Sequence, residues 1–427
     1  MKSRHTLIIF LLCAFQALLA VAQDDPEPTS SSDSSSDSIE QWSRDLDSAS
    51  FAEREAAMRK LVAAGRRAIP AVVEMVQRGS PEAIWRALDV LEQLSRSDDY
   101  QLQDLTAAAL EQLAESSNHT VAIRAEGVLR NYRLGRKQNA IMRLRTLGAT
   151  LSSDNGTTSV RMDDKWKGGN TGLVHLKFLP EIASLRLERS LVSDEGLSKL
   201  KGLDKLEKLY LGGAQIRGPG LATMKDLPSL RFLSLKALKL EGDAIRYLAE
   251  ATQIEQLGLD ETQVGNDGLA YLTGMKNLRT LWLNNTQVTD DGLEHLSGLV
   301  NLNKLILTAT QIDGHGLDHL KGATGLRYLS LQHVKFTDDD MQHLSELKQL
   351  ETLGLDDTQI SDAGIHHLES LESLQTLWLN NTKVTDASIP HVKKLAKLQR
   401  LYLKGTKFTE NGALELSKAL PKCQIVR

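Results

Sequence analysis

The sequence predicts an α/β solenoid with a parallel sheet on its concave face, preceded by an all-α domain of paired helices. The C-terminal two-thirds carries one apolar pattern that recurs every 24 residues without an insertion. Each copy has two leucines two residues apart, which is strand spacing, and then leucines three apart, which is helical spacing. Upstream of these copies, residues 39–149 have helical periodicity throughout.

The clearest copy of the pattern is residues 278–300, LRTLWLNNTQVTDDGLEHLSGLV. Its Leu281 and Leu283 project the same way from a short strand, and Thr289 or Asp290 is expected to cap the helical arm that follows. One unit cannot bury its own apolar face, so neighbouring units must stack and share a core. Ten expected repeats and a C-terminal cap span 182–427, and the first core position recurs at Ile182, Leu206, Leu230, Ile254, Leu278, Leu302, Leu326, Leu350, Leu374 and Leu398.

The run from Leu281 to Leu293 resembles the leucine-rich-repeat family. Its T-D-x-G-L segment is similar to the cysteine-containing subtype of that family. Bacterial secreted proteins of the planctomycete type, which join helical repeats to such segments, are the nearest likeness. The family has Asn or Cys where this chain has Thr286, Thr310, Thr358 and Thr382. Leu238 and Val334 depart from the pattern and predict an interrupted polar ladder at their coils. The resemblance implies binding of a partner and no particular chemistry.

Residues 1–22 are typical of a secretory signal peptide. Lys2 and Arg4 provide a basic head, an apolar stretch follows, and small residues precede a cleavage site after Ala22. A retained anchor is the alternative, but the apolar stretch is shorter than the about 20 residues that a span needs. We therefore expect a secreted or periplasmic protein that does not span a membrane once the signal is removed.

The composition of the mature chain excludes some classes of partner and cross-link. Loss of Lys2 and Arg4 leaves 49 basic against 55 acidic residues, a net charge of −6, which does not favour bulk nucleic-acid binding. Of the two cysteines only Cys423 remains, so we expect no internal disulfide. Cys423 is predicted to help close the last coil, and a link between two chains is the alternative.

Three segments lie between the signal and the repeats. Residues 23–38 have five acidic residues and no basic one, which predicts a disordered Ser/Asp linker; a calcium or phosphorylation tract is the alternative. Residues 39–149 resemble HEAT-type helical repeats, and a small helical bundle is the alternative. Ser80 and Pro81 mark one helix start there. Residues 150–181 are expected to form a capping repeat with a bulged strand, which protects the end of the sheet.

The end of the helical region is rich in arginine. Separate helices are expected at 101–115, 120–134 and 136–147. The basic residues are Arg124, Arg130, Arg133, Arg136, Lys137, Arg143 and Arg145, opposed only by Glu126. They could meet an anionic partner, but such arginines more often form a solvated helix face or pack at a junction, which is the interpretation we favour.

The outward position between the two strand leucines changes in a regular order along the repeats. From Tyr210 it runs Tyr, Ser, Gly, Trp, then Ile, Ser, Gly, Trp, then Tyr. The surrounding text agrees, because LWLNNT at Leu281 returns at Leu377 and LGLDETQV at Leu257 returns as LGLDDTQI at Leu353. We infer that a block of four repeats was duplicated.

The duplication predicts two similar patches on the concave face. One holds Asp260, Glu261, Trp282, Asn284 and Asn285; the other holds Asp356, Asp357, Trp378, Asn380 and Asn381. The residues expected to extend the aromatic face are Tyr210, Phe232, Tyr328 and Tyr402. With strands about 4.8 Å apart, the patches should lie roughly 19 Å from each other. Gly258 and Gly354 are expected to leave room beside each Trp. An exposed Trp beside carboxylates and amides suits an apolar anchor or a sugar ring.

Two other interpretations of these polar residues remain open. The Asn-Asn and Asp-Asp pairs could instead cap the strand ends, with the duplication reflecting ancestry alone. A calcium site is less favoured, because each patch offers two or three oxygens and calcium takes six to eight. Histidines at His295, His319, His343, His367 and His391 recur every 24 residues on the outer arm, with His175 in phase. They could suggest a metal track or a pH switch, but we interpret them as a solvated repeat position without a metal.

Enzyme chemistry finds no support in the sequence. It has no nucleophile elbow, P-loop, Cys-His pair or H-E-x-x-H motif, and we expect neither catalysis nor a cofactor. The predicted function is a non-catalytic extracytoplasmic protein that binds a protein or peptide through the concave face. The alternatives are a regulatory inhibitor or adaptor of an enzyme, and a glycan-binding protein.

Overall fold

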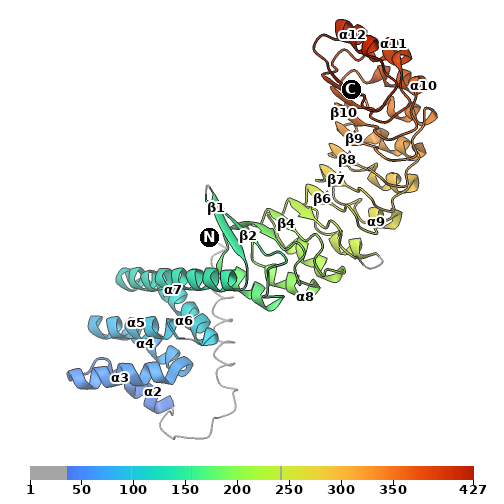
Figure 1. Ribbon diagram of the computed structural model, residues 1–427. Helices are drawn as coiled ribbons and strands as arrows, with labels where there is room; N and C mark the ends of the chain where they lie inside the picture. Colours follow the sequence, from blue (N-terminus) through green and yellow to red (C-terminus); the bar gives the residue numbers. More distant parts are fainter. Residues whose placement is uncertain (1–35, 98, 155, 241–242) are drawn as a thin grey trace. The chain divides into compact units, whose positions relative to one another are not determined.

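The computed structural model describes residues 36–427 apart from positions 98, 155 and 241–242 (Figure 1). The predicted signal peptide and most of the predicted acidic linker lie outside the described residues. The chain divides into two compact units between Gln138 and Asn139, whereas we expected the helical region to extend to residue 149. Each unit is described by itself below.

The N-terminal unit is entirely helical. Its helices are α2 (Ser36–Asp45), α3 (Phe51–Ala64), η1 (Gly65–Ala68), α4 (Ile69–Arg78), α5 (Pro81–Ser95), α6 (Tyr100–Ala114) and the first part of α7 (His119–Thr146). Helix α5 starts as predicted, because the Ser80 side chain accepts the N–H of Ala83 and Pro81 occupies the first turn. The apolar faces of these helices form one buried core.

Helix α7 corrects the prediction of two separate helices at its position. It runs for 28 residues without a break at Gly135. A glycine alone weakens a helix by only about 1 kcal/mol, and no proline or capping residue follows Gly135 to stop it.

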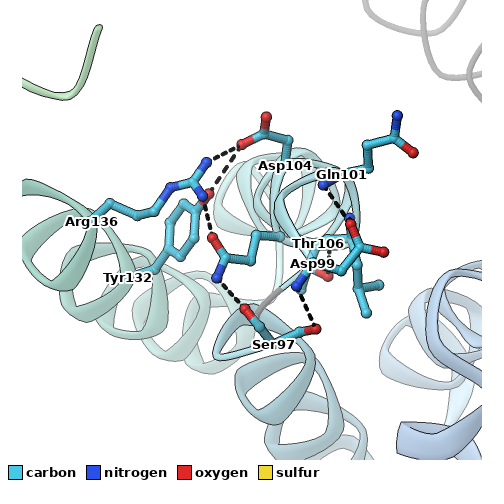
Figure 2. A network of polar contacts seen from close by, with 9 residues as sticks. Ser97, Asp99, Gln101, Asp104, Thr106, Tyr132 and Arg136 are labelled. Carbon is cyan, nitrogen blue, oxygen red and sulfur yellow. Dashed lines mark hydrogen bonds and ion pairs between the residues drawn. The ribbon is translucent and has the colours of Figure 1, made fainter. Parts of the chain in front are cut away.

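Three of the six arginines of α7 bind neighbouring helices of the unit. Arg136 is 6% exposed and donates to the Asp104 carboxylate at 2.6 Å and to the Gln103 side chain (Figure 2). Its guanidinium also lies 4.9 Å from the Tyr100 ring centroid and 5.4 Å from that of Tyr132. Burial raises the pKa of Tyr132 to about 12. This network ties α6 to α7.

Two further arginines of α7 are engaged in the same way. Arg124 lies 2.9 Å from the carboxylates of both Asp89 and Glu92 on α5, and Arg133 lies 2.7 Å from Glu111 on α6. Three of the seven basic residues therefore take part in contacts between helices of this unit, which neither the solvated face nor the junction had specified.

The second unit is a solenoid whose strands stack in sequence order into one sheet of thirteen strands (Figure 1). All neighbouring strands are parallel except β1 and β2. The strands are β1 (Thr150–Asp154), β2 (Thr157–Arg161), β3 (Ile182–Arg186), β4 (Lys208–Tyr210), β5 (Phe232–Ser234), β6 (Gln256–Gly258), β7 (Thr280–Trp282), β8 (Lys304–Ile306), β9 (Tyr328–Ser330), β10 (Thr352–Gly354), β11 (Thr376–Trp378), β12 (Arg400–Tyr402) and β13 (Gln424–Val426). The predicted fold class, an α/β leucine-rich-repeat solenoid preceded by an all-α domain, is confirmed.

The outer arms of the coils are mostly 3₁₀ rather than α-helical. Leucines three residues apart fall on one side of a 3₁₀ helix, which has three residues per turn, so the spacing already favoured this form. The arms are η2 (Thr171–Phe178), α8 (Asp194–Leu197), η3 (Ser198–Leu200), η4 (Pro219–Asp226), η5 (Ala244–Leu248), α9 (Asn266–Ala270), η6 (Asp290–Leu296), η7 (His315–Gly322), η8 (Asp339–Leu344), α10 (Asp362–Ile365), η9 (His366–Ser370), η10 (Asp386–Ser388), α11 (Ile389–Val392) and the longer α12 (Glu410–Ala419).

The expected cap of η6 is not formed. Thr289 stands at the N-cap position but makes no capping hydrogen bond, and its hydroxyl accepts from the Asn266 side chain of the preceding coil at 2.8 Å. The Asp290 carboxylate accepts the backbone N–H of Gly314 and of Gly316 in the next coil. These polar side chains therefore join coils instead of capping their own arm.

The buried threonine hydroxyls bond within their own coil, as when the Thr286 hydroxyl donates to the Leu283 carbonyl at 2.7 Å. Leu238 and Val334 have no hydroxyl at this position, so the series of side-chain bonds is interrupted at their coils, as predicted. The backbone hydrogen bonds between coils continue there, because the N–H of Ala237 donates to the backbone carbonyl of Asp260 and that of His333 to the backbone carbonyl of Asp356.

The glycine of the T-D-x-G-L segment is required by the coil before it. A Cβ at Gly292 would lie 2.5 Å from Oδ1 of Asn266, which accepts the N–H of Thr289. In the pair Gly314 and Asp340 the earlier position is glycine and the later one carries a side chain. A Cβ at Gly314 would meet that of Asp340 at 2.6 Å. The two positions therefore compete for one space in these coils, whereas Asp362 and Ser388 show that both can carry a side chain when the later one is small.

The two ends of the solenoid are closed differently. At the first end, β1 and β2 form an antiparallel hairpin, and the register between β2 and β3 shifts at Thr158 and Ser159, which is the expected bulge. At the other end β13 follows α12, and Cys423 is buried in the core beside it. Burial raises the pKa of the Cys423 thiol to about 11.

Candidate functional site

The predicted site residues lie on the strands of the sheet or in the turns that leave them. Tyr210, Trp282, Trp378 and Tyr402 each end a strand and point outward from the core, half-buried. The polar members Asp260, Glu261, Asn284, Asn285, Asp356, Asp357, Asn380 and Asn381 follow the ends of β6, β7, β10 and β11. We call this solvent-facing side of the solenoid the sheet face.

Aromatic rings on the sheet face pack into two runs. In the first run the ring centroids of Tyr210 and Phe232 are 4.8 Å apart, and those of Phe232 and Trp282 are 6.0 Å apart. Phe232 and Trp282 lie two coils from each other, so the indole spans the coil of β6. The Phe232–Trp282 contact is edge-to-face, an arrangement that stabilises aromatic pairs.

The second run repeats this design. Trp378 lies 6.1 Å from Tyr328, again two coils away, and 5.9 Å from Tyr402 on the next strand. Phe232 and Tyr328 were expected to extend the aromatic face, but their contacts with the two tryptophans were not predicted. They occupy the other outward position of their strands, four coils apart.

The glycines beside the two tryptophans differ in what they make room for. A Cβ at Gly354 would lie 3.2 Å from Cε3 of Trp378, so this glycine is needed for the close approach of the indole, as predicted. A Cβ at Gly258 would have Ser234 as its nearest neighbour, with Oγ at 3.6 Å, which is ordinary contact. The prediction is therefore confirmed at Gly354 and not at Gly258.

Each aromatic run begins with a cation. The guanidinium of Arg186 lies 3.9 Å from the ring centroid of Tyr210, and the ammonium of Lys304 lies 4.1 Å from that of Tyr328. These distances are within the range of cation–π attraction. The strand residues therefore place a positive charge at the N-terminal end of each apolar run.

The first polar residue after each strand holds the next coil in place. Asp260 accepts the backbone N–H of Asn284 at 2.9 Å, and Asn284 in turn accepts that of Thr308 at 3.1 Å. In the second patch, Asp356 accepts the N–H of Asn380 at 2.7 Å. These contacts agree with the alternative in which the polar pairs bind backbone groups at the strand ends. The side chains of Asp260, Asn284 and Asp356 therefore stabilise the stacking of coils.

The second residue of each polar pair occupies a left-handed turn. Glu261, Asn285, Asp357 and Asn381 have φ values of 58°, 53°, 58° and 56°. Asn and Asp tolerate this conformation better than most residues, which accounts for three of the four. Glu261 forms an ion pair with Lys236 at 3.0 Å. These residues form the edge of the sheet face, and the aromatic runs form its centre.

The carboxylates of Asp260 and Asp356 are half-buried behind this edge. Burial raises the pKa of both above the ordinary aspartate value, and the hydrogen bonds from Asn284 and Asn380 oppose that shift. Ionisation of Asp260 and Asp356 in the folded protein therefore costs free energy.

A hollow of about 480 Å³ lies on the sheet face over β1 to β4. Tyr210 and Arg186 are among its lining residues, so it adjoins the first aromatic run. Strand β1 and this hollow were not predicted from the sequence. The signal was the Asp-Asn-Gly triplet at 154–156 between two stretches rich in Thr and Ser, which is typical of a tight hairpin.

The outer-arm histidines are partly paired with acidic residues of the preceding coil. His343 lies 2.6 Å from Asp318, and His391 lies 2.6 Å from Glu369. Burial lowers the pKa of His367. Over the described parts of the chain, no three His, Cys, Asp or Glu side chains are placed to hold a metal ion. The column is thus more involved in coil-to-coil contacts than a solvated position would be.

Comparison with known proteins finds similar solved structures. No family model matches the chain, and no curated protein does so either. An internalin of Listeria monocytogenes is similar with 20% identity and a TM-score of 0.42, over 64% of this chain and 86% of that one. A leucine-rich-repeat protein of Leptospira interrogans is 19% identical with a TM-score of 0.38, over 60% and 80%. The mouse RP105/MD-1 complex is 19% identical with a TM-score of 0.47, and the match covers 59% of this chain and 47% of that one.

Within residues 36–427, gaps excepted, no helix is both long and apolar enough to cross a bilayer.

Proposed function

We propose that this protein binds a protein partner through the sheet face of its solenoid, outside the cytoplasm and without catalysis. The observation that carries the proposal is the pair of aromatic runs, Tyr210–Phe232–Trp282 and Tyr328–Trp378–Tyr402. Partly exposed aromatic side chains in a packed row are the residues that dominate the energy of protein interfaces.

The contacts among the rings favour a polypeptide over a glycan. Arg186 covers one face of the Tyr210 ring, and Trp282 meets Phe232 edge-to-face. The rings therefore form a continuous apolar surface instead of separate platforms for sugar rings. A polypeptide can cover such a surface with several apolar side chains along its length.

The repetition of the design supports a partner that contacts both runs. Trp282 and Trp378 lie four coils apart, about 19 Å at roughly 4.8 Å per strand. Two such contacts on one partner reinforce each other, because the second forms at a high effective concentration once the first has formed.

The test compares the wild-type chain with Trp282→Ala, Trp378→Ala. Each immobilised protein is exposed to the native envelope fraction, captured proteins are quantified by mass spectrometry, and the dissociation constant of the leading one is measured. We expect a loss of about 100-fold, since truncation of a central aromatic residue costs about 1.4 kcal/mol or more and each such step is tenfold. The control is Leu191→Ala, which removes a 63% exposed leucine of the solenoid outside the strands.

Three results would count against the proposal. Equal affinity of the folded double variant removes the sheet face as the site. Capture of a single enzyme that loses activity on binding would favour the regulatory inhibitor or adaptor, and retention of a glycan alone would favour glycan binding. Export is tested separately: the mature protein in the extracytoplasmic fraction should begin at Gln23, and an uncut N-terminus would refute the proposed cleavage.

A further inference from the structure

The hollow over β1 to β4 exists because the strands at this end carry small side chains. Thr150, Ser152, Thr157, Ser159 and Ser184 line it, and within each strand they alternate, so they belong to one face of the sheet. At the position equivalent to Ser184 the next two strands carry the longer side chains of Lys208 and Phe232. The result is a depression with a floor of hydroxyl groups, each able to donate a hydrogen bond.

The wall of the hollow is predominantly positive. Arg161, Arg186 and Lys208 line it together with one acidic residue, Glu207. Within the described ranges, Arg161 and Lys208 make no salt bridge, whereas Arg186 is 3.1 Å from Glu188. Arg186 is also stacked on the adjacent Tyr210 ring, which fixes its guanidinium before any ligand arrives.

Tyr210 belongs to both the hollow and the first aromatic run. The positive hollow and the apolar surface are therefore continuous parts of the sheet face. From β4, which carries Tyr210, to β7, which carries Trp282, there are three strand spacings, about 14 Å. An extended peptide rises about 3.4 Å per residue, so about four residues cover this distance.

We infer that the hollow binds the carboxylate side chain of an acidic peptide segment, and that an apolar side chain about four to six residues away packs on Trp282. This inference rests on the proposed function and specifies the partner of the same site. Guanidinium, ammonium and hydroxyl donors around one cavity match the acceptor oxygens of a carboxylate. An acidic residue followed at that spacing by an apolar one matches the order of the positive hollow and the aromatic run.

The test uses a position-scanning library of fluorescent decapeptides and the full chain. We expect selection of Glu or Asp at one position and of aromatic or aliphatic residues four to six positions away. A selected peptide should lose about tenfold in affinity when its Glu is changed to Gln. The charge-removed variant, Arg161→Gln, Lys208→Gln, should show less than about a twofold difference between the same two peptides.

The matched control removes two positive charges from the other end of the same face. Arg400→Gln, Lys404→Gln has the same net charge as the test variant and should keep the tenfold preference for Glu. Trp282→Ala should weaken both peptides equally and keep that preference. Near-ultraviolet circular dichroism establishes that each variant is folded.

The outcomes separate this inference from the proposed function. The acid site alone is overturned if peptides bind through Trp282 without a preference for an acidic residue. It is also overturned if they have that preference and Arg161→Gln, Lys208→Gln leaves it intact. If no peptide binds in a way that depends on Trp282 or Trp378, both the acid site and the proposed function are overturned. Selection of acidic oligosaccharides from a parallel array, lost in the charge-removed variant, would assign the hollow to a glycan and overturn the peptide.

Discussion

Replacement of Gly292 by alanine tests whether neighbouring coils share a single space. The added Cβ would lie 2.5 Å from Oδ1 and 3.1 Å from Cγ of Asn266, and 3.3 Å from Cδ1 of Leu269. Ordinary contact begins near 3.4 Å, so the Asn266 side chain must move by about 1 Å. That movement breaks its two hydrogen bonds to Thr289, at 3.0 and 2.8 Å.

The magnitude follows from these contacts. Two hydrogen bonds are worth about 1 kcal/mol each, and alanine recovers about 0.4–1 kcal/mol by restricting the unfolded chain. We expect a net loss of about 1–2 kcal/mol for Gly292→Ala. Asn266→Gly should cost about 2 kcal/mol, because it loses the same bonds. The double variant should cost little more than Asn266→Gly, so the coupling is about 1–2 kcal/mol.

The assay is urea unfolding followed by far-ultraviolet circular dichroism and tryptophan fluorescence. The control is Gly274→Ala, where the nearest atom to the new Cβ is the Ala249 carbonyl oxygen at 3.9 Å, and it should change stability by less than about 0.5 kcal/mol. Additivity of the Asn266→Gly and Gly292→Ala effects within about 0.3 kcal/mol would refute the shared space. We expect coupling between the two sites, because the native pair Gly314 and Asp340 has a glycine where a Cβ would meet the Cβ of the partner position at 2.6 Å.

Three other predictions concern ionisable groups. Asp260 and Asp356 have a raised pKa, so the folded state binds more protons than the unfolded state and stability falls as pH rises through the carboxyl range. The double variant Asp260→Asn, Asp356→Asn should therefore be more stable than wild type at pH 7. Thermal unfolding should show this difference in stability closing as the pH falls. Arg136→Met should destabilise the helical unit by about 2 kcal/mol in urea unfolding, because it removes the hydrogen bonds from the buried guanidinium to Asp104 and Gln103; no change would refute its role. Cys423 should react slowly with a thiol reagent at pH 8 and rapidly in urea, and rapid native labelling would contradict its burial.

Local signals in the sequence were reliable where one coil or one helix decides the outcome. The start of α5 at Ser80 follows from a capping side chain and a proline within one turn. The bulge beside β2 follows from a one-residue shift against the 24-residue register. Helix α7 was predicted wrongly because a glycine was taken as a break, although continued helix costs little there.

Contacts between coils were harder to predict. The polar pairs after the strands were chosen for their exposed chemistry, yet Asp260 and Asp356 bind backbone groups one coil away. Phe232 and Tyr328 were expected on the aromatic face, but their contacts with Trp282 and Trp378 were not predicted, because the direction of an indole ring is not visible in a repeat pattern. The two indoles lie across the neighbouring coil and reach these rings.

The sequence alone determined the solenoid, its 24-residue period and the leucines of its core. In a repeat fold each unit buries its apolar face only against its neighbours, so the spacing of leucines along the chain dictates the stacking. Only the tertiary structure decided which aromatic rings meet, that Asn266 and Gly292 share one space, and that small residues on β1 to β3 leave a hollow bordered by Arg161 and Lys208. These features depend on side-chain directions across adjacent coils, and the volume left between them exists only once the coils are stacked.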